Sequence, residues 1–144
     1  MQKRSNKANR SKESILADVK NLLFILHPAI QQMPKIERID GAPQMMKQSC
    51  YDLIGHYTVA REVPEVRSEN IRAMWSDFGK ILAAFELCIQ RGLFTGKTAL
   101  KIAEQTERIR EGIRKWRNAT RSPKSEARCE VGEPGSQECA VSDE

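Results

Sequence analysis

Apolar residues in this sequence recur at spacings of three and four in four separate stretches of the chain. On an α-helix that spacing places the apolar side chains on one face, while polar side chains occupy the opposite face. The third stretch has the clearest stripe: Ile71, Met74, Trp75, Phe78, Ile81, Leu82, Phe85 and Cys88. The first stretch has a stripe of similar length: Ile15, Leu16, Val19, Leu22, Leu23, Leu26, Ala29, Ile30 and Met33. The pattern predicts amphipathic helices, and no stretch alternates as a β-strand would.

The second and fourth stretches predict two further helices, each with a single apolar face. The second face consists of Met46, Cys50, Leu53, Ile54, Tyr57 and Ala60. The fourth face consists of Leu100, Ala103, Thr106, Ile109, Ile113 and Trp116. Each helix therefore has one face to bury against the others.

Proline residues mark several helix boundaries, because proline has no N–H group and crowds the preceding turn. Pro28 lies within the first stripe and is expected to kink that helix or to separate its last turn. Pro34 ends the helix, and residues 34–43 form a connection rich in turn-forming residues. Pro43 and Pro64 suit the first turns of the second and third helices, where a missing N–H costs nothing.

Capping residues define the remaining helix ends. Ser11 is a suitable N-cap for the first helix, and Thr95 for the fourth. Gly92 is placed to close the third helix. Four amphipathic helices with short connections predict an all-α fold, an antiparallel up-down four-helix bundle over residues 12–119.

The charge of the chain is unevenly distributed around its net value of +5. Residues 1–14 carry five basic side chains and one acidic, residues 15–119 carry 16 and 12, and residues 120–144 carry three and six. We expect residues 1–11 to form a basic flexible arm and residues 120–144 a disordered acidic tail, since neither has much apolar surface to bury. A basic arm and body suggest a nucleic acid or another acidic partner.

Cysteine usage and hydropathy exclude several classes of protein. Cys50 and Cys88 fall on apolar helix faces, where a free cysteine acts as a small hydrophobic side chain. Cys129 and Cys139 have neither CxxC spacing nor a nearby histidine, so we expect no zinc site and no other cofactor. No apolar run approaches the roughly 20 residues that cross a bilayer. We also expect no signal peptide, because no apolar stretch follows the basic residues at the start of the sequence. We therefore expect a cytoplasmic protein with no membrane partner.

No constellation of residues predicts catalysis. The Gly-Lys-Thr at residues 96–98 lacks the glycine spacing of a phosphate-binding loop and no strand precedes it, so a capped helix start is expected. Neither His27 nor His56 belongs to a repeated pattern in which a carboxylate or a nucleophile lies one helical turn from a histidine. Diiron bundles need Glu-x-x-His pairs, and the sequence has none. We expect a protein that is not an enzyme.

The fourth helix carries the most concentrated positive charge in the sequence. Its seven basic residues are the candidate nucleic-acid-binding residues, with residues 1–12 assisting: Lys97, Lys101, Arg108, Arg110, Arg114, Lys115 and Arg117. Three glutamates are spaced for pairs one turn away, in which Glu104 meets Arg108, Glu107 meets Arg110 and Glu111 meets Lys115. The helix is therefore either a solvated, salt-bridged face or a phosphate-binding surface driven by counterion release. No aromatic residue is expected among these charges on the exposed side of the helix, since Trp116 belongs to the apolar face, so base stacking is expected to be weak.

Two parts of the chain resemble a known protein family. Over residues 26–35 the sequence LHPAIQQMPK resembles the Leu-Tyr-Pro-x-x-x-x-x-Pro-Lys/Arg signature of the accessory variability determinant (Avd) family of diversity-generating retroelements. Residues 93–119 resemble the last helix of that family, which commonly ends in a Gly-x-x-x-Gly-x-Trp-like sequence, and Gly112 and Trp116 stand in that region. The resemblance covers about residues 15–119.

The resemblance implies a specific function. Such proteins are non-enzymatic partners of a retroelement reverse transcriptase. They assemble as homopentamers of four-helix bundles and bind nucleic acid through basic surface. The complex makes cDNA from a template RNA, and the polymerase performs the chemistry. The implied partners are therefore a reverse transcriptase, RNA and possibly DNA, and further copies of the same chain.

Two functions remain open for this chain. The chain is either an Avd-like accessory protein or a four-helix protein-interaction bundle without nucleic-acid binding. A third class, an enzyme with a site inside the bundle, has no supporting residues in the sequence.

Overall fold

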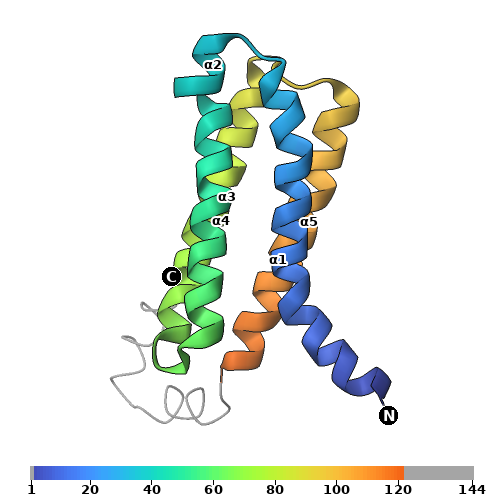
Figure 1. The fold of residues 1–144 in the computed structure, drawn as a ribbon, viewed down its shortest axis with the longest axis vertical. Coiled ribbons are helices and arrows are strands. Elements are labelled where there is room, and N and C mark those ends of the chain that lie inside the picture. The colour runs from blue at the N-terminus through green and yellow to red at the C-terminus, as the bar shows by residue number, and fades with distance from the viewer. Residues whose placement is uncertain (1, 122–144) are drawn as a thin grey trace, which may run out of the picture.

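The computed structural model describes residues 2–121, with side chains described for residues 14–39 and 41–121. Four long helices run alternately up and down, which confirms the predicted all-α four-helix bundle (Figure 1). The helices are α1 (Gln2–Gln31), α3 (Ala42–Glu62), α4 (Arg67–Gln90) and α5 (Gly96–Thr120). A short helix α2 (Lys35–Asp40) and a 3-10 turn η1 (Pro64–Val66) lie between them. The closest neighbours are α3 with α4 and α1 with α5.

The first helix begins earlier than the predicted N-cap at Ser11. The structure places residues 2–11, predicted to be a flexible arm, in the first turns of α1, which extend away from the bundle (Figure 1). Residues 2–27 contain no glycine or proline, so nothing in the sequence interrupts the helix there. The predicted acidic tail lies outside the described residues, apart from Thr120 and Arg121.

Proline has different effects at three positions. Pro28 lies inside α1, and the helix continues past it to Gln31 rather than losing its last turn. Pro43 occupies the first turn of α3, as predicted. Pro64 opens η1 rather than α4 itself, which begins three residues later.

The connection predicted over residues 34–43 contains the helix α2. Its Glu37 side chain is buried and forms an ion pair with Arg91, which follows the last residue of α4. Gly41 lets the chain pass close to this carboxylate, because a Cβ there would lie 2.6 Å from Glu37 Oε2. The ion pair ties α2 to the end of α4, and a local sequence pattern does not reveal this contact.

The turn from α4 to α5 has the predicted residues in the predicted roles. Gly92 adopts a φ of 64°, in the left-handed region that favours glycine. Its N–H donates to the carbonyl of Ile89, and the N–H of Leu93 donates to that of Cys88, both at 3.0 Å. Thr95 then caps α5, because its hydroxyl accepts a hydrogen bond from the N–H of Thr98 at 3.2 Å.

The core is mainly aliphatic and lies between the four long helices. The stripes predicted for α1, α3 and α4 are buried or packed against the core. Two aromatic rings close one end of it, where Tyr57 and Trp116 approach to 5.5 Å between centroids. The thiols of Cys50 and Cys88 are free and buried. Burial raises the pKa of Cys50 to about 12, so this thiol is an inert packing group.

The face predicted for α5 is wrong at its N-terminal end. Ile102 is fully buried, whereas Leu100 is 61% exposed and Ala103 is also exposed. Successive helical residues differ by about 100°, so Leu100 lies on the side opposite Ile102. The buried stripe therefore runs from Ile102 through Thr106 and Ile109.

Gly112 allows α5 to approach α1 closely. A Cβ at Gly112 would lie 2.7 Å from Cγ1 of the buried Ile15, whereas nothing lies within 4 Å of a Cβ at Gly79. Both glycines lie inside helices. We predict that Gly112→Ala lowers the free energy of unfolding by about 1–3 kcal/mol. The matched control Gly79→Ala raises it by roughly 0.5–1 kcal/mol. Urea denaturation followed by circular dichroism measures both, and a Gly112→Ala variant as stable as Gly79→Ala would contradict the close packing.

Candidate nucleic-acid interface

The structure divides the seven predicted residues between two flanks of α5. One flank faces α1 and is called here the α1-facing flank: Lys97, Lys101, Arg108 and Lys115. The other flank faces α4: Arg110, Arg114 and Arg117. The exposed ridge between the two flanks consists of Leu100, Glu104, Glu107 and the partly exposed Glu111. The seven residues therefore do not form one continuous basic patch.

The α4-facing arginines are engaged in packing. The guanidinium carbon of Arg110 lies 5.6 Å from the centroid of the Phe78 ring. The guanidinium of Arg117 lies 5.3 Å from the Trp75 ring. Such cation–π contacts are attractive and hold the arginine against the ring. These two side chains therefore help to fix α5 on α4 and are less available to a ligand.

Two glutamates of the exposed ridge pair with arginines of the α4-facing flank. Glu107 lies 3.8 Å from Arg110, which confirms the predicted pair. Glu111 was predicted to pair with Lys115 but instead accepts a hydrogen bond from Arg114 at 2.8 Å. An arginine presents a rigid fork of donors that suits a carboxylate better than an ammonium does. This hydrogen bond is the main reason that the pKa of Glu111 is lowered.

The α1-facing flank is the more available of the two. All four of its side chains are exposed, and within the described side chains none of them forms an ion pair. One carboxylate, Asp18 of α1, lies near enough to interact with Arg108. Partial burial raises the pKa of Asp18, and the positive charge of Arg108 opposes that rise. Four cations along about five turns of one helix side form a row that suits a polyanion.

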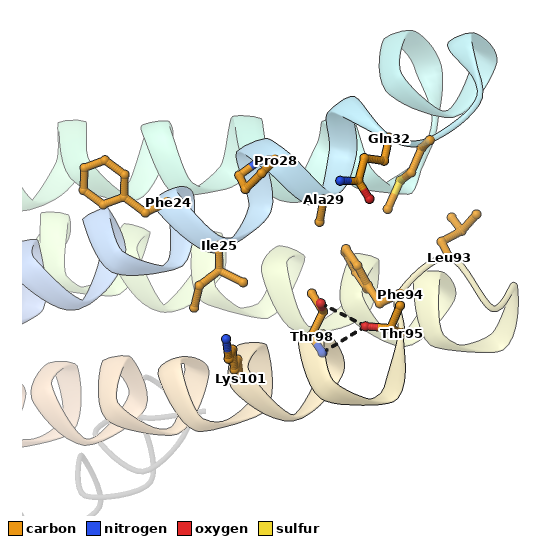
Figure 2. Close-up of a pocket in the computed structure, with 11 residues that line it drawn as sticks. Phe24, Ile25, Pro28, Ala29, Gln32, Leu93, Phe94, Thr95, Thr98 and Lys101 are labelled. Carbon is orange, nitrogen blue, oxygen red and sulfur yellow. Dashed lines mark hydrogen bonds between the residues drawn. The ribbon is translucent and has the colours of Figure 1, made fainter.

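An open pocket of about 480 Å³ lies beside this flank, between α1 and the start of α5 (Figure 2). Lys101 projects from α5 toward α1 and lies near Ile25 (Figure 2). Phe24, Pro28 and Phe94 provide apolar walls. The pocket thus combines an apolar surface with one free cation at its edge.

A second open hollow, of about 470 Å³, lies on the other side of α1, between α1 and α3. Its lining residues are Lys20, Leu23, Phe24, His27, Lys47 and Tyr51. Phe24 is 75% exposed and Tyr51 is 50% exposed. The sequence pattern did not lead us to predict this cluster. The signal that could have revealed it is Phe24, an aromatic residue that falls outside the apolar stripe of its helix.

His56 has a carboxylate partner that the sequence did not predict. Its Nδ1 lies 2.5 Å from Oδ2 of Asp77, and the Asp77 side chain is buried. The two residues come from α3 and α4, 21 positions apart, so helical spacing within one element does not reveal the pair. The His56–Asp77 contact joins these two helices. The Nε2 atom of His27, in contrast, lies 3.4 Å from Nε2 of Gln31, one turn further along the same helix.

The described residues offer neither a metal site nor a membrane span. There, no group of three or more histidine, cysteine, aspartate or glutamate side chains is placed to hold a metal ion. None of the helices formed by residues 2–121 is long and apolar enough to cross a bilayer. Cys129 and Cys139 lie outside the described residues.

Comparison with known proteins leaves the family unassigned. Searches with protein-family models, against curated proteins and against solved structures found no match to this chain. The resemblance of residues 26–35 and 93–119 to the Avd family therefore stays a prediction, and the chain's function must be argued from its own surface.

Proposed function

We propose that this protein is a non-enzymatic accessory protein that binds RNA and a reverse transcriptase to support cDNA synthesis in diversity-generating retrohoming. The observation that carries the proposal is the α1-facing flank, a row of four exposed cations without ion-pair partners among the described side chains. The Avd-like sequence at residues 26–35 supplies the retroelement context.

The chemistry of the flank suits phosphate rather than a specific base sequence. Lysine presents a compact charge on a flexible stem, which contacts phosphate oxygens without reading base edges. Release of the counterions held by the RNA supplies much of the affinity. Binding of this kind recognises the shape and charge of a folded RNA, and a reverse transcriptase bound beside it would perform the polymerisation.

Exposed apolar side chains support the protein-binding part of the proposal. Ile36 and Ile39 of α2 are 75% and 61% exposed, and Met45 at the start of α3 is 53% exposed. Large apolar side chains that remain exposed favour contact with another protein. The polymerase and further copies of the chain, as a homopentamer, are the partners that the Avd resemblance implies.

Neutralising the α1-facing flank is the test of the proposal. We expect the quadruple substitution of Lys97, Lys101, Arg108 and Lys115 by glutamine to weaken binding of a structured RNA by at least about tenfold. Fluorescence anisotropy with a labelled RNA at fixed salt measures the affinity. The triple substitution of Arg110, Arg114 and Arg117 by glutamine should weaken binding less, because Phe78, Trp75 and Glu111 already engage those side chains.

A matched control separates local contact from net charge. The control variant replaces four exposed cations elsewhere with glutamine: Lys35, Arg38, Arg61 and Lys80. It carries the same change in net charge, so an equal loss of affinity would show that the flank has no special role. A wild-type protein that binds no RNA but does bind protein partners would favour the alternative function, a protein-interaction bundle.

A further inference from the structure

The hollow between α1 and α3 exposes aromatic rings that the fold does not need. Phe24 is 75% exposed and therefore adds little to the core, which lies on the other side of α1. Tyr51, on α3, lines the same hollow and is 50% exposed. Aromatic side chains left exposed together on one surface are typical of a binding site.

The charges around these rings are positive. Lys20 and Lys47 line the hollow from α1 and α3, and His27 adds an imidazole ring. No carboxylate is among the described residues that line it. A ligand with a flat, uncharged ring system and a negatively charged backbone complements both features. The volume of the hollow, about 470 Å³, falls in the range of small-ligand sites, roughly 300–1,000 Å³.

The hollow shares one lining residue with the pocket beside the α1-facing flank. Phe24 lines both this hollow and the pocket beside α5, where Lys101 projects toward α1 (Figure 2). Helix α1 therefore has cations on both sides, and the exposed phenyl ring of Phe24 lies between them. A flexible strand that crosses α1 from Lys101 would reach Phe24, which lines the pocket on each side of the helix.

We propose that the hollow binds unpaired nucleotides of the RNA, whose bases stack on Phe24 and Tyr51 while Lys20 and Lys47 contact the flanking phosphates. Proteins that bind single strands combine aromatic stacking with a basic groove in this way, and stacking tolerates any base because every base has a π-face. The inference rests on the proposed function and adds to it a preference for single-stranded segments.

The test compares ring-deleting and ring-preserving substitutions. Phe24→Leu keeps an apolar side chain but removes the ring, and Phe24→Tyr keeps the ring. Tyr51→Leu removes the second ring. Leu87→Ala is the matched control, since Leu87 is an apolar residue that is 48% exposed but lies on α4. Affinity is measured for an unstructured single-stranded RNA of about ten nucleotides and for a duplex of the same length. Circular dichroism confirms the fold of each variant.

We expect Phe24→Leu combined with Tyr51→Leu to weaken single-strand binding by about tenfold or more, with little change in duplex binding. Phe24→Tyr and Leu87→Ala should bind as the wild type does. Equal affinity of the double variant and the wild type for the single strand would overturn the inference. An equal loss of affinity for the single strand and the duplex would also overturn the inference. A change in oligomer mass with no change in RNA affinity would overturn it as well, because it would assign the hollow to contacts between copies of the chain. If the inference is overturned but the wild-type protein still binds the duplex in a salt-dependent way, the proposed function stands. A wild-type protein that binds neither the single strand nor the duplex would contradict both the inference and the proposed function.

Discussion

Replacing Ile102 with alanine is expected to lower the free energy of unfolding by about 2–5 kcal/mol. Ile102 is fully buried in α5, so the substitution removes apolar contacts and leaves a cavity. The matched variant is Leu100→Ala, two residues earlier on the same helix, where the side chain is 61% exposed. We expect that variant to change stability by no more than about 0.5 kcal/mol.

Urea denaturation of the two variants therefore measures the register of α5 directly. The apolar pattern alone placed Leu100 on the buried face, and the structure places Ile102 there instead. A larger loss from Leu100→Ala than from Ile102→Ala would support the pattern against the structure. The register also determines which flank each basic residue occupies, so the result bears on the candidate interface as well as on the core.

The second large effect is expected from Arg91→Met. Arg91 is largely exposed, but its ion-pair partner Glu37 has a side chain only 8% exposed. Removing the guanidinium leaves a buried carboxylate with no cation, which costs about 3 kcal/mol when a buried pair is broken from one side. The negative charge of Glu37 already contributes, after burial, to raising the pKa of the Cys88 thiol to about 11.

The double variant Arg91→Met with Glu37→Gln is the control for this prediction. It removes both charges, so we expect it to recover most of the lost stability. Thermal denaturation gives the global effect, and limited proteolysis within residues 34–43 reports whether α2 leaves the end of α4. An Arg91→Met variant with wild-type stability and wild-type proteolysis would show that the ion pair does not hold α2 in place.

Local patterns were sufficient for most of the fold. The stripes of α1, α3 and α4 are long and regular, so their buried faces follow from helical spacing. Proline and glycine at Pro43 and Gly92 have the predicted roles because their backbone preferences are local properties. The fourth stripe was ambiguous, since Leu100 and Ile102 both fit apolar spacings with residues further along α5.

Features that depend on contacts between distant residues could not be predicted. The helix α2 is held by the pair between Glu37 and Arg91, which lie 54 positions apart in the sequence. Asp77 stands within an apolar stripe of α4, and its partner His56 is on α3. Which arginines of α5 remain available depends on Phe78 and Trp75 of α4. The seven candidate residues were identifiable from charge, but their division into two flanks required the packing of neighbouring helices.

The most direct test of the proposed phosphate-binding surface is the salt dependence of RNA binding by the full chain. If the four cations of the α1-facing flank each contact a phosphate, the logarithm of the association constant should fall linearly with the logarithm of salt concentration, with a slope of about −3. The quadruple glutamine variant of that flank should show a clearly shallower slope, because only phosphate contacts outside the flank, such as those of Lys20 and Lys47, would remain. An affinity that does not change with salt, or an equal slope in the two proteins, would contradict the assignment of this flank as the phosphate-binding surface.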